Sequence, residues 1–550
     1  MKQVYLFLSA CMLAGMVHAT VYYVSPEGDN SDGKTWATAF QSPAKALSTV
    51  TSGSHEVWVK QGTYISATTL KWIPGANFYG GFTGTEISRD ERNTDPSLTI
   101  LEGTRTSGVL TTPQSAYSTL WNGFTIQKGK ATGGGGGIFL QRNTTLENCI
   151  VQDNEATNYG GGGIYIQDAN NGRIQILNCI VRNNKLTPTA ADRDGGGITV
   201  RATKSSDVLI GNCIIEGNIV DAGAQSRAFG GGISLLSGAT VANCIIRNNQ
   251  VTKPSGSNCN GGGMYISLDD AGVSANISNC IIANNFCDAG NGGGVFVTEK
   301  AGNVSFGNCH IVNNQITYAS YGGGGIFTKN PATVVNCVFW GNDAPGSTPK
   351  HFRTDGGGSV SYCAFDAQAN GTAFGTATVA DNITVETENL GNLANAHYAA
   401  FVRPTAFAGK ASNDIELAEL QQADWSPLAT SALINAGTTV AVITDDMAGI
   451  ARPQGTAYDI GAYEFEEKTT PGTGIDPAQV KTAFDAPVYT TSGNIVLKNA
   501  EDNASAIIYD ITGRTVKNVH LAVGENTISV PSRGLYYVKT GQSLLKVMVR

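Results

Sequence analysis

The residues best suited to carry chemistry are eight cysteines that recur at one position of a repeated signature. Asparagine, or tyrosine in the last copy, precedes each cysteine, and two mostly aliphatic residues follow it. Thiolates can hold metal ions or form disulfides, but no histidine shares this position. We therefore expect a buried ladder of small apolar side chains whose native thiols resist labelling. Its members, 26 to 36 residues apart, are Cys149, Cys179, Cys213, Cys244, Cys280, Cys309, Cys337 and Cys363.

The rest of the repeat indicates which elements position this ladder. Each unit holds a glycine tract (residues 356–358 in the last unit), a short strand, and a second strand whose apolar residue lies three positions before the cysteine. The residue two after the cysteine is apolar, and the residue five after it is asparagine in the first seven units. Inward residues of a strand are two apart, so the phase changes at the asparagine before the cysteine, which tolerates the left-handed conformation of a corner. Three short strands and three corners form one rung of a β-solenoid.

Composition excludes several classes of protein. The chain has 550 residues, 68 of them glycine, only 15% charged residues and a net charge of −8. This balance argues against a nucleic-acid partner. The high glycine content and the absence of a 3.6-residue apolar period argue against helices. A β-propeller blade has four strands, which does not fit the three strands and the glycine tract of this repeat.

The N-terminal region reads as a secretory signal followed by a cap. A lysine and then an apolar run precede a cleavage site between Ala19 and Thr20, so residues 1–19 are the expected signal peptide. No later stretch is long and apolar enough to cross a membrane. Residues 20–130 suggest a strand, a short amphipathic helix that covers the solenoid end, and the first irregular rungs.

Two cysteines lie outside the ladder. Cys259 and Cys287 occupy the loops before the glycine tracts of consecutive rungs. A disulfide between them is possible in an exported chain, and two separate thiols are the alternative.

The cap and the glycine-glycine-aliphatic rungs resemble the pectate-lyase-like superfamily of right-handed parallel β-helices, and bacterial surface proteins with similar repeats. The resemblance implies an all-β fold, with regular rungs over residues 131–370 and a closing segment over residues 371–466. Residues 431–437, Arg452-Pro453 and residues 459–464 are similar to the closing segment of secreted β-helix proteins. Asp445 and Asp446 could hold calcium there, although turn carboxylates are the simpler interpretation.

After a linker at residues 467–477, residues 478–550 alternate like a small antiparallel β-sandwich. They resemble the C-terminal sorting domain of type IX secretion, and an immunoglobulin-like module is the alternative. The resemblance implies export by the type IX machinery to the outer surface of a Gram-negative cell. The motifs that carry it include Gly493, Asp510, Gly513, Arg514, Gly534 and Tyr536.

The middle residue of the strand after each glycine tract should point away from the core. Five of these residues are aromatic, and stacked one rung apart they would line a shallow face that binds polysaccharide. Loops folded over the rings would bury them instead. The five are Phe139, Tyr165, Tyr265, Phe296 and Phe327. We also expect His310, one after its cysteine, to lean outward and to bind no metal.

Catalysis is the competing hypothesis. A lyase of the resembling fold needs a lysine or arginine base beside carboxylates that hold calcium, and a hydrolase needs paired carboxylates. No such cluster is identifiable, so we predict a surface rod or adhesin that binds a polysaccharide, glycoprotein or host surface, with a polysaccharide lyase as the alternative. The loop groups considered are Asp192-Arg193-Asp194, Asp168 with Arg173, and Lys350, His351 and Arg353 with Asp355.

Overall fold

The computed structural model describes residues 20–466 and 488–549, apart from short gaps. The gaps are residues 52, 113, 159, 169–170, 188–192, 204–206, 224–226, 253–258, 301, 318–321, 387–397, 492–493, 500–503, 511–514, 531–533 and 541–542. The expected signal peptide with Ala19 lies outside the described residues, as does the linker at residues 467–477.

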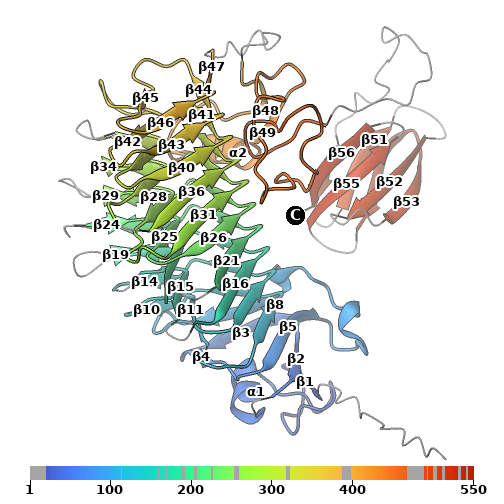
Figure 1. The fold of residues 1–550 in the computed structure, drawn as a ribbon. Coiled ribbons are helices and arrows are strands. Elements are labelled where there is room, and N and C mark those ends of the chain that lie inside the picture. The colour runs from blue at the N-terminus through green and yellow to red at the C-terminus, as the bar shows by residue number, and fades with distance from the viewer. Residues whose placement is uncertain are drawn as a thin grey trace, which may run out of the picture.

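Most of the described chain winds into a parallel β-helix whose turns add one strand at a time to three long parallel sheets (Figure 1). Sheet A holds β1 (Thr20–Val24), β2 (His55–Lys60), β5 (Ala76–Phe82), β8 (Thr119–Asn122), β12 (Thr144–Glu147), β16 (Arg173–Leu177), β21 (Asp207–Gly211), β26 (Ala239–Ala242), β31 (Ser274–Ser278), β36 (Asn303–Gly307), β40 (Ala332–Val335), β43 (Gly358–Ser361) and β46 (Thr378–Ala380). Thirteen strands, each about 4.8 Å from the next, make sheet A roughly 60 Å long.

Sheets B and C complete the rungs. Sheet B holds β3 (Gly62–Ser66), β6 (Thr99–Gly103), β9 (Thr125–Gln127), β13 (Ile150–Gln152), β17 (Ile180–Arg182), β22 (Ile214–Glu216), β27 (Ile245–Arg247), β32 (Ile281–Ala283), β37 (His310–Val312), β41 (Val338–Trp340), β44 (Ala364–Asp366) and β47 (Ile383–Val385). Sheet C holds β4 (Leu70–Lys71), β7 (Leu110–Thr111), β11 (Ile138–Leu140), β15 (Ile164–Asp168), β20 (Ile198–Ala202), β25 (Ile233–Leu235), β30 (Met264–Ile266), β35 (Val295–Val297), β39 (Ile326–Thr328), β42 (Phe352–Thr354) and β45 (Thr372–Ala373).

The repeat positions its residues as the sequence predicts. Every residue before a ladder cysteine is in the left-handed region, with φ between +49° and +54°, and all eight ladder cysteines are at most 1% exposed. The thiol of Cys179 contacts the carbonyl oxygen of Leu146 on the preceding rung at 3.6 Å. Burial raises the pKa of thiols such as Cys213 and Cys244 well above the ordinary value. The ladder therefore consists of protonated core residues.

The corner after sheet B carries a second ladder, made of the asparagines five residues after cysteine. The Nδ2 of every member except the last donates to the Oδ1 of the next asparagine at 2.9 to 3.0 Å. All seven are at most 1% exposed, so their amide groups must satisfy one another. We call the set the asparagine ladder: Asn154, Asn184, Asn218, Asn249, Asn285, Asn314 and Asn342.

Beyond this corner the variable loops form a second layer of short parallel strands. Sheet D holds β10 (Lys130–Ala131), β14 (Glu155–Ala156), β18 (Lys185–Leu186), β23 (Ile219–Asp221), β28 (Gln250–Thr252), β33 (Phe286–Cys287) and β38 (Gln315–Ile316). Sheet E holds β19 (Arg193–Asp194), β24 (Ala228–Phe229), β29 (Cys259–Asn260) and β34 (Gly290–Asn291). The two sheets enclose a small core of their own.

Helices are few and short. Helix α1 (Pro43–Thr49) lies where the sequence indicates a cap helix, begins at the N-cap Ser42, and adds Ala46 to the main core. The others are α2 (Asp414–Gln421) and the 3₁₀ turns η1 (Arg89–Glu91) and η2 (Pro96–Leu98). None of the helices in the described ranges is long and apolar enough to cross a membrane.

The last unit departs from the predicted pattern. Phe352 pairs with Ile326, so Lys350 and His351 precede the strand of sheet C, in the place of a glycine tract. Residues 356–358 follow β42 instead. The rungs also continue past residue 370, because β45 to β47 add strands to all three long sheets.

Within the expected closing segment, residues 371–386 continue the rungs, and residues 398–466, to which we now restrict the name closing segment, cover the outer face of sheet B. The closing segment contains the antiparallel pair β48 (Phe401–Arg403) and β49 (Asp424–Pro427). Its Phe401, Trp425 and Ile460 pack with Val312 and Val338 in one buried cluster. The segment therefore shields an apolar stripe of the solenoid from water.

The C-terminal residues form the predicted antiparallel β-sandwich. One sheet orders β50 (Val488–Thr491), β51 (Asn494–Asn499) and β54 (Gly524–Ser529). The other orders β53 (Thr515–Leu521), β52 (Ala504–Asp510), β55 (Gly534–Thr540) and β56 (Ser543–Val549). Residues such as Ile495, Ile508 and Val538 fill the space between them.

Candidate functional site

The aromatic face predicted from the repeat is not exposed. Tyr165, Tyr265, Phe296 and Phe327 are at most 9% exposed, and Phe139 is half-buried. Tyr265 stacks between Phe229 of sheet E, at a centroid distance of 4.4 Å, and Phe296, at 6.0 Å. Side chains in register on adjacent rungs cover each other's faces, and the second layer covers the rest. The expectation of a solvent-facing aromatic strip was wrong, because Tyr265, Phe296 and Phe327 form a core of their own with Phe229 and Tyr165 is buried as well.

Cys259 and Cys287 are both present as thiols rather than as a disulfide. They lie in the small core between sheets D and E and are fully buried. Burial raises the pKa of Cys287 well above its ordinary value. Cys259 and Cys287 therefore act as small apolar core residues, as the ladder cysteines do.

The loop groups considered for catalysis separate in space. The carboxylate of Asp168 accepts from the backbone N–H of Gly172, at 2.5 Å, whereas Arg173 pairs with Asp207 at 3.3 Å. Asp192 lies outside the described residues, and Arg193 and Asp194 form β19. The described contacts of Asp168 and Arg173 thus go to different partners, Gly172 and Asp207.

The third group divides among three acids. Arg353 pairs with Asp355 at 2.9 Å on the surface. Lys350 instead lies 3.5 Å from Asp343, and His351 lies 2.7 Å from Asp366. The last two pairs bring charged groups to one place, the junction with the closing segment.

Two rows of corner asparagines dock the closing segment onto the solenoid. On one edge of sheet B, the amide of Asn336 donates to Thr438 O at 2.7 Å. On the other edge, Asn313 donates to Thr405 O at 2.8 Å and Asn284 to Phe407 O at 2.7 Å. The loop of residues 404–408 is therefore held against the rungs by asparagine side chains that donate to its backbone carbonyl oxygens.

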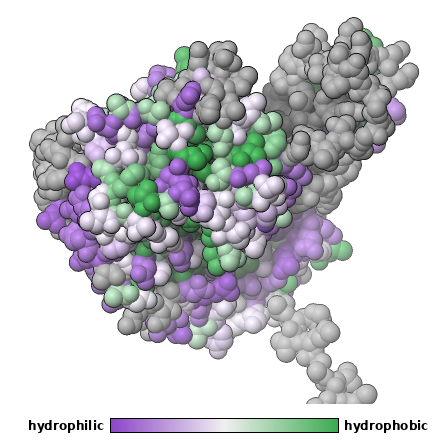
Figure 2. Space-filling model, turned by 45° about the horizontal axis from the view of Figure 1, so that its top comes forward, coloured by the Kyte–Doolittle hydropathy of each residue, from purple (hydrophilic) through white to green (hydrophobic). Residues whose placement is uncertain are grey.

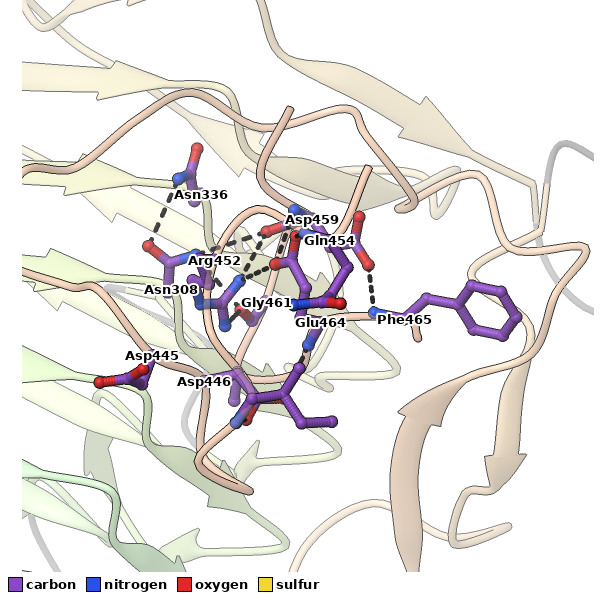
Figure 3. Close-up of polar contacts among 12 residues, drawn as sticks. Asn308, Asn336, Asp445, Asp446, Arg452, Gln454, Asp459, Gly461, Glu464 and Phe465 are labelled. Carbon is purple, nitrogen blue, oxygen red and sulfur yellow. Dashed lines mark hydrogen bonds and ion pairs between the residues drawn. The ribbon is translucent and has the colours of Figure 1, made fainter. Parts of the chain in front are cut away.

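A buried ion pair completes the docking (Figure 3). Arg452 donates to Glu464 at 2.7 Å, with both side chains fully buried, and to the carbonyl oxygen of Gly461 at 2.9 Å. Burial lowers the pKa of Arg452, although the Glu464 carboxylate opposes this shift. Asp459 accepts the backbone N–H of Asn435 at 2.7 Å. The residues that resemble the closing segment of secreted β-helix proteins thus stabilise the fold of this segment.

Asp446 and His310 also belong to this junction. One oxygen of Asp446 accepts the backbone N–H groups of Ala448 and Ile450, at 2.7 and 2.8 Å, so Asp446 is a turn carboxylate. His310 points away from the core as expected, yet it is only 1% exposed because the closing segment covers it. Its Nδ1 accepts the Ala462 N–H at 2.9 Å, and burial lowers its pKa to about 3.

A cavity of about 350 Å³ lies where the loop of residues 404–408 meets the last rungs; we call it the closing pocket. Trp340 and Asp366 end adjacent strands β41 and β44 of sheet B, and so face the same opening. Trp340 is half-buried, with its ring 5.8 Å from those of Phe401 and Trp425. The lining consists of Asn313, Trp340, Gly341, Asp343, Asp366, Gln368 and residues 404–408.

Asp366 is the most constrained group of the closing pocket. Its carboxylate receives hydrogen bonds from His351 Nε2 at 2.7 Å, from the Gly341 N–H at 2.6 Å, and from the side chain of Gln368 at 3.0 Å. Burial acts to raise the pKa of Asp366, but these bonds outweigh it and hold the pKa below its ordinary value. Asp366 is therefore an anion fixed in the wall of the pocket.

The pocket combines apolar and polar walls. Trp340, Pro404 and Phe407 offer apolar surface, whereas Asp343 and Gln368 offer oxygen and amide groups. Figure 2 turns this end of the solenoid toward the viewer and shows hydrophobic and hydrophilic residues interspersed over it. Within the described residues, no group of three histidine, cysteine or acidic side chains could hold a metal ion.

Sequence reasoning missed Trp340, Asp343, Asp366 and Gln368. A signal was present in the breaks of the repeat, because Gln368 stands where seven earlier units have asparagine. Trp340 and Asp366, three residues after Cys337 and Cys363, are the last members of a row that begins with the polar residues Gln152, Arg182, Glu216 and Arg247 and continues with Ala283 and Val312.

The sorting-domain residues fall only partly within the described structure. Gly493, Gly513 and Arg514 lie outside the described residues, and Asp510 and Gly534 end and begin strands β52 and β55. Tyr536 packs into the sandwich core at 3% exposure.

Among solved structures, the chain has matches of low similarity. The catalytic unit of a thermostable GH87 alpha-1,3-glucanase from Streptomyces thermodiastaticus is 12% identical, with a TM-score of 0.22, over 68% of this chain and 71% of that chain. A PL6 family polysaccharide lyase from Pseudopedobacter saltans is 10% identical, with a TM-score of 0.22, over 70% and 96%. Pectate lyase Pel9A is 15% identical, with a TM-score of 0.41, over 81% and 96%. These values are too low to transfer an activity.

No curated protein matches the chain at a significant level. The sequence profile described as "Right handed beta helix region" matches residues 107–390, which is more than half of the chain. The protein therefore belongs to the family of right-handed β-helix proteins.

Proposed function

We propose that this protein is a surface rod that binds glycans, as an adhesin does, and that the closing pocket is the binding site. The observation that carries the proposal is the pairing of the Trp340 ring with the polar groups of Asp343 and Gln368 around one cavity. A sugar ring offers an apolar face to an aromatic side chain and hydroxyl groups to carboxylates and amides. The cavity of about 350 Å³ falls in the range typical of small-ligand sites. The ligand would be part of a polysaccharide, a glycoprotein or a host surface.

Preorganisation supports the same site. The loop wall is pinned by Asn284 and Asn313, and Asp366 is held by three different donors. A pocket fixed before binding loses little conformational freedom when it accepts a ligand.

A glycan array with a matched pair of variants tests the binding site. Asp343 and Asp355 are both partly exposed acids beside a cation, with side chains 43% and 46% exposed, but only Asp343 lines the pocket. Asp343→Ala should weaken glycan retention at least tenfold, Asp355→Ala should not, and the melting temperatures should agree. Equal binding by the two variants, or no retained glycan with the native protein, would refute the proposal.

Export to the outer surface of a Gram-negative cell is the second part of the proposal. It is supported by the signal-like residues 1–19, by the sorting motifs, and by the antiparallel sandwich at residues 488–549. The solenoid buries its own core and has its own closing segment. A chain that ends near residue 467 should therefore fold and remain in the periplasm. Surface display of this shortened chain would contradict sorting by the type IX machinery.

A polysaccharide lyase remains the second candidate, because one observation favours it. Lys350 lies beside the pocket, 27% exposed and 3.5 Å from Asp343, where an amine could remove a proton from a bound sugar. Release of unsaturated oligosaccharides that disappears in Lys350→Ala would favour this candidate over a purely binding role.

A further inference from the structure

We infer, on the basis of the proposed function, that the closing pocket selects glycans that carry a positively charged amino group and discriminates against uronates. The inference concerns the class of ligand at the same site. It follows from the way in which the asparagine ladder orients His351 toward Asp366, and from the carboxylates that line the pocket.

The asparagine ladder ends at Asn342 in the last rung that carries one. Its Oδ1 accepts from the backbone N–H and the Nδ2 of Asn314, at 2.9 and 3.0 Å. Its Nδ2 donates one hydrogen to Ile311 O at 2.7 Å. A flipped amide would break these bonds, so the orientation of Asn342 is set by the ladder.

The second hydrogen of Asn342 Nδ2 meets His351, which takes the place of a further ladder residue. The Nδ2 to Nδ1 distance is 3.4 Å, so Nδ1 must accept. The proton of the imidazole then lies on Nε2, which donates to Asp366 at 2.7 Å. His351 thus donates through Nε2 to Asp366 from behind, and it is not one of the residues that line the pocket.

The remaining groups around the pocket leave the wall negative. The carboxylate of Asp343 is 3.5 Å from Lys350 and accepts from Gln315 Nε2 at 3.1 Å. Of the described residues that line the closing pocket, none is lysine or arginine. The nearest amine, that of Lys350, is paired with Asp343 and lies outside the lining, so a carboxylated sugar would meet the carboxylates of Asp343 and Asp366.

A cationic sugar fits the same lining. An ammonium group is attracted both by carboxylates and by the face of an indole ring, and the pocket offers Trp340 together with Asp343 and Asp366. A sugar with a free amine therefore satisfies the apolar wall with its ring and the acidic wall with its charge. Acetylation of the amine would remove the second contribution.

Titration calorimetry on the full mature chain tests the inference with three tetrasaccharides of equal length. They are built from glucosamine, N-acetylglucosamine and galacturonate. The glucosamine tetramer should bind at least tenfold more tightly than the acetylated one, the galacturonate tetramer should bind most weakly, and added salt should reduce the differences. Asp343→Asn and Asp366→Asn should each reduce the preference for the amine, and Asp355→Asn should preserve it.

The outcomes separate the two proposals. Equal or tighter binding of the acetylated or galacturonate tetramer overturns the inference while the glycan-binding role stands. The Asp343 side chain is partly exposed, and a thermal melt can verify that Asp343→Asn is folded. If this folded variant keeps the full preference for the amine, the inference is overturned as well. Absence of binding to any tetramer and to every glycan of the array overturns both.

Discussion

The asparagine ladder provides the sharpest test of what stabilises this β-helix, and Asn184→Ala is the variant to make. Asn184 is fully buried. Its Nδ2 donates to Val151 O at 2.9 Å and to Asn218 Oδ1 at 3.0 Å. Its Oδ1 accepts from the backbone N–H and the Nδ2 of Asn154, at 3.1 and 3.0 Å. Alanine removes four hydrogen bonds at once.

The expected loss follows from that count. A net contribution of about 1 kcal/mol for each bond gives about 4 kcal/mol of unfolding free energy. The groups left behind are in a dry interior where water cannot replace the amide, so the loss should not fall below this value. A typical domain has an unfolding free energy of roughly 10 kcal/mol, so the expected loss is a large fraction of the total.

Urea unfolding of the mature chain, followed by circular dichroism, measures this loss. The matched control is Asn183→Gly, one residue earlier in the chain. Asn183 is exposed and has a φ of +54°, a conformation that glycine adopts readily, so the control should lose less than about 1 kcal/mol. If Asn184→Ala loses as little unfolding free energy as Asn183→Gly, and the dependence of that free energy on urea concentration is unchanged, hydrogen bonding along the ladder is not what stabilises the rungs.

Two further predictions concern titratable core groups. Burial raises the pKa of the ladder thiols, so a thiol reagent at about pH 8 should label the eight ladder cysteines only after unfolding; rapid native labelling of most of them would contradict the buried ladder. Burial, with a contribution from the Glu464 carboxylate, raises the pKa of Asp459 from 3.8 to about 6. Protonation of Asp459 therefore favours the folded state: its stabilisation is fully present below about pH 4 and is lost as the pH rises through about 6. Asp459→Asn should remove this part of the pH dependence in thermal melts, and an identical pH profile would show that Asp459 titrates normally.

The features that the sequence predicts correctly are those that recur. The inward position of Cys244 and the left-handed corner at Asn243 are each one of eight similar instances, so a local geometric rule is tested many times along the chain. Such rules depend on residues two or three apart, and the period of the strand determines them. The parallel register of Ile138 with Ile164, and of Leu146 with Ile176, follows from the same rules.

The burial of Tyr265 could not be predicted in this way. Its cover comes from Phe229, in a short strand of a variable loop, and from Phe296 on the next rung. The loops differ in length and composition, so nothing local indicates that they pair as sheet E. The pocket was missed for a related reason, since Trp340 meets the loop of residues 404–408 only after the chain has returned along the solenoid.

The place of the pocket follows from where the repeat stops repeating. In the row three residues after cysteine, the first four members pair with one another, as Arg182 does with Gln152 at 2.9 Å and Arg247 with Glu216 at 2.8 Å. The next two members, Ala283 and Val312, pack in the apolar cluster under the closing segment. The last two members, Trp340 and Asp366, cannot form such a pair and instead face the closing segment. The asparagine ladder ends at the same rung, so its terminal amide acts on His351 rather than on another asparagine. A regular solenoid satisfies its polar groups internally along its length, and the groups available to a ligand are therefore those at the position where two internal ladders end together.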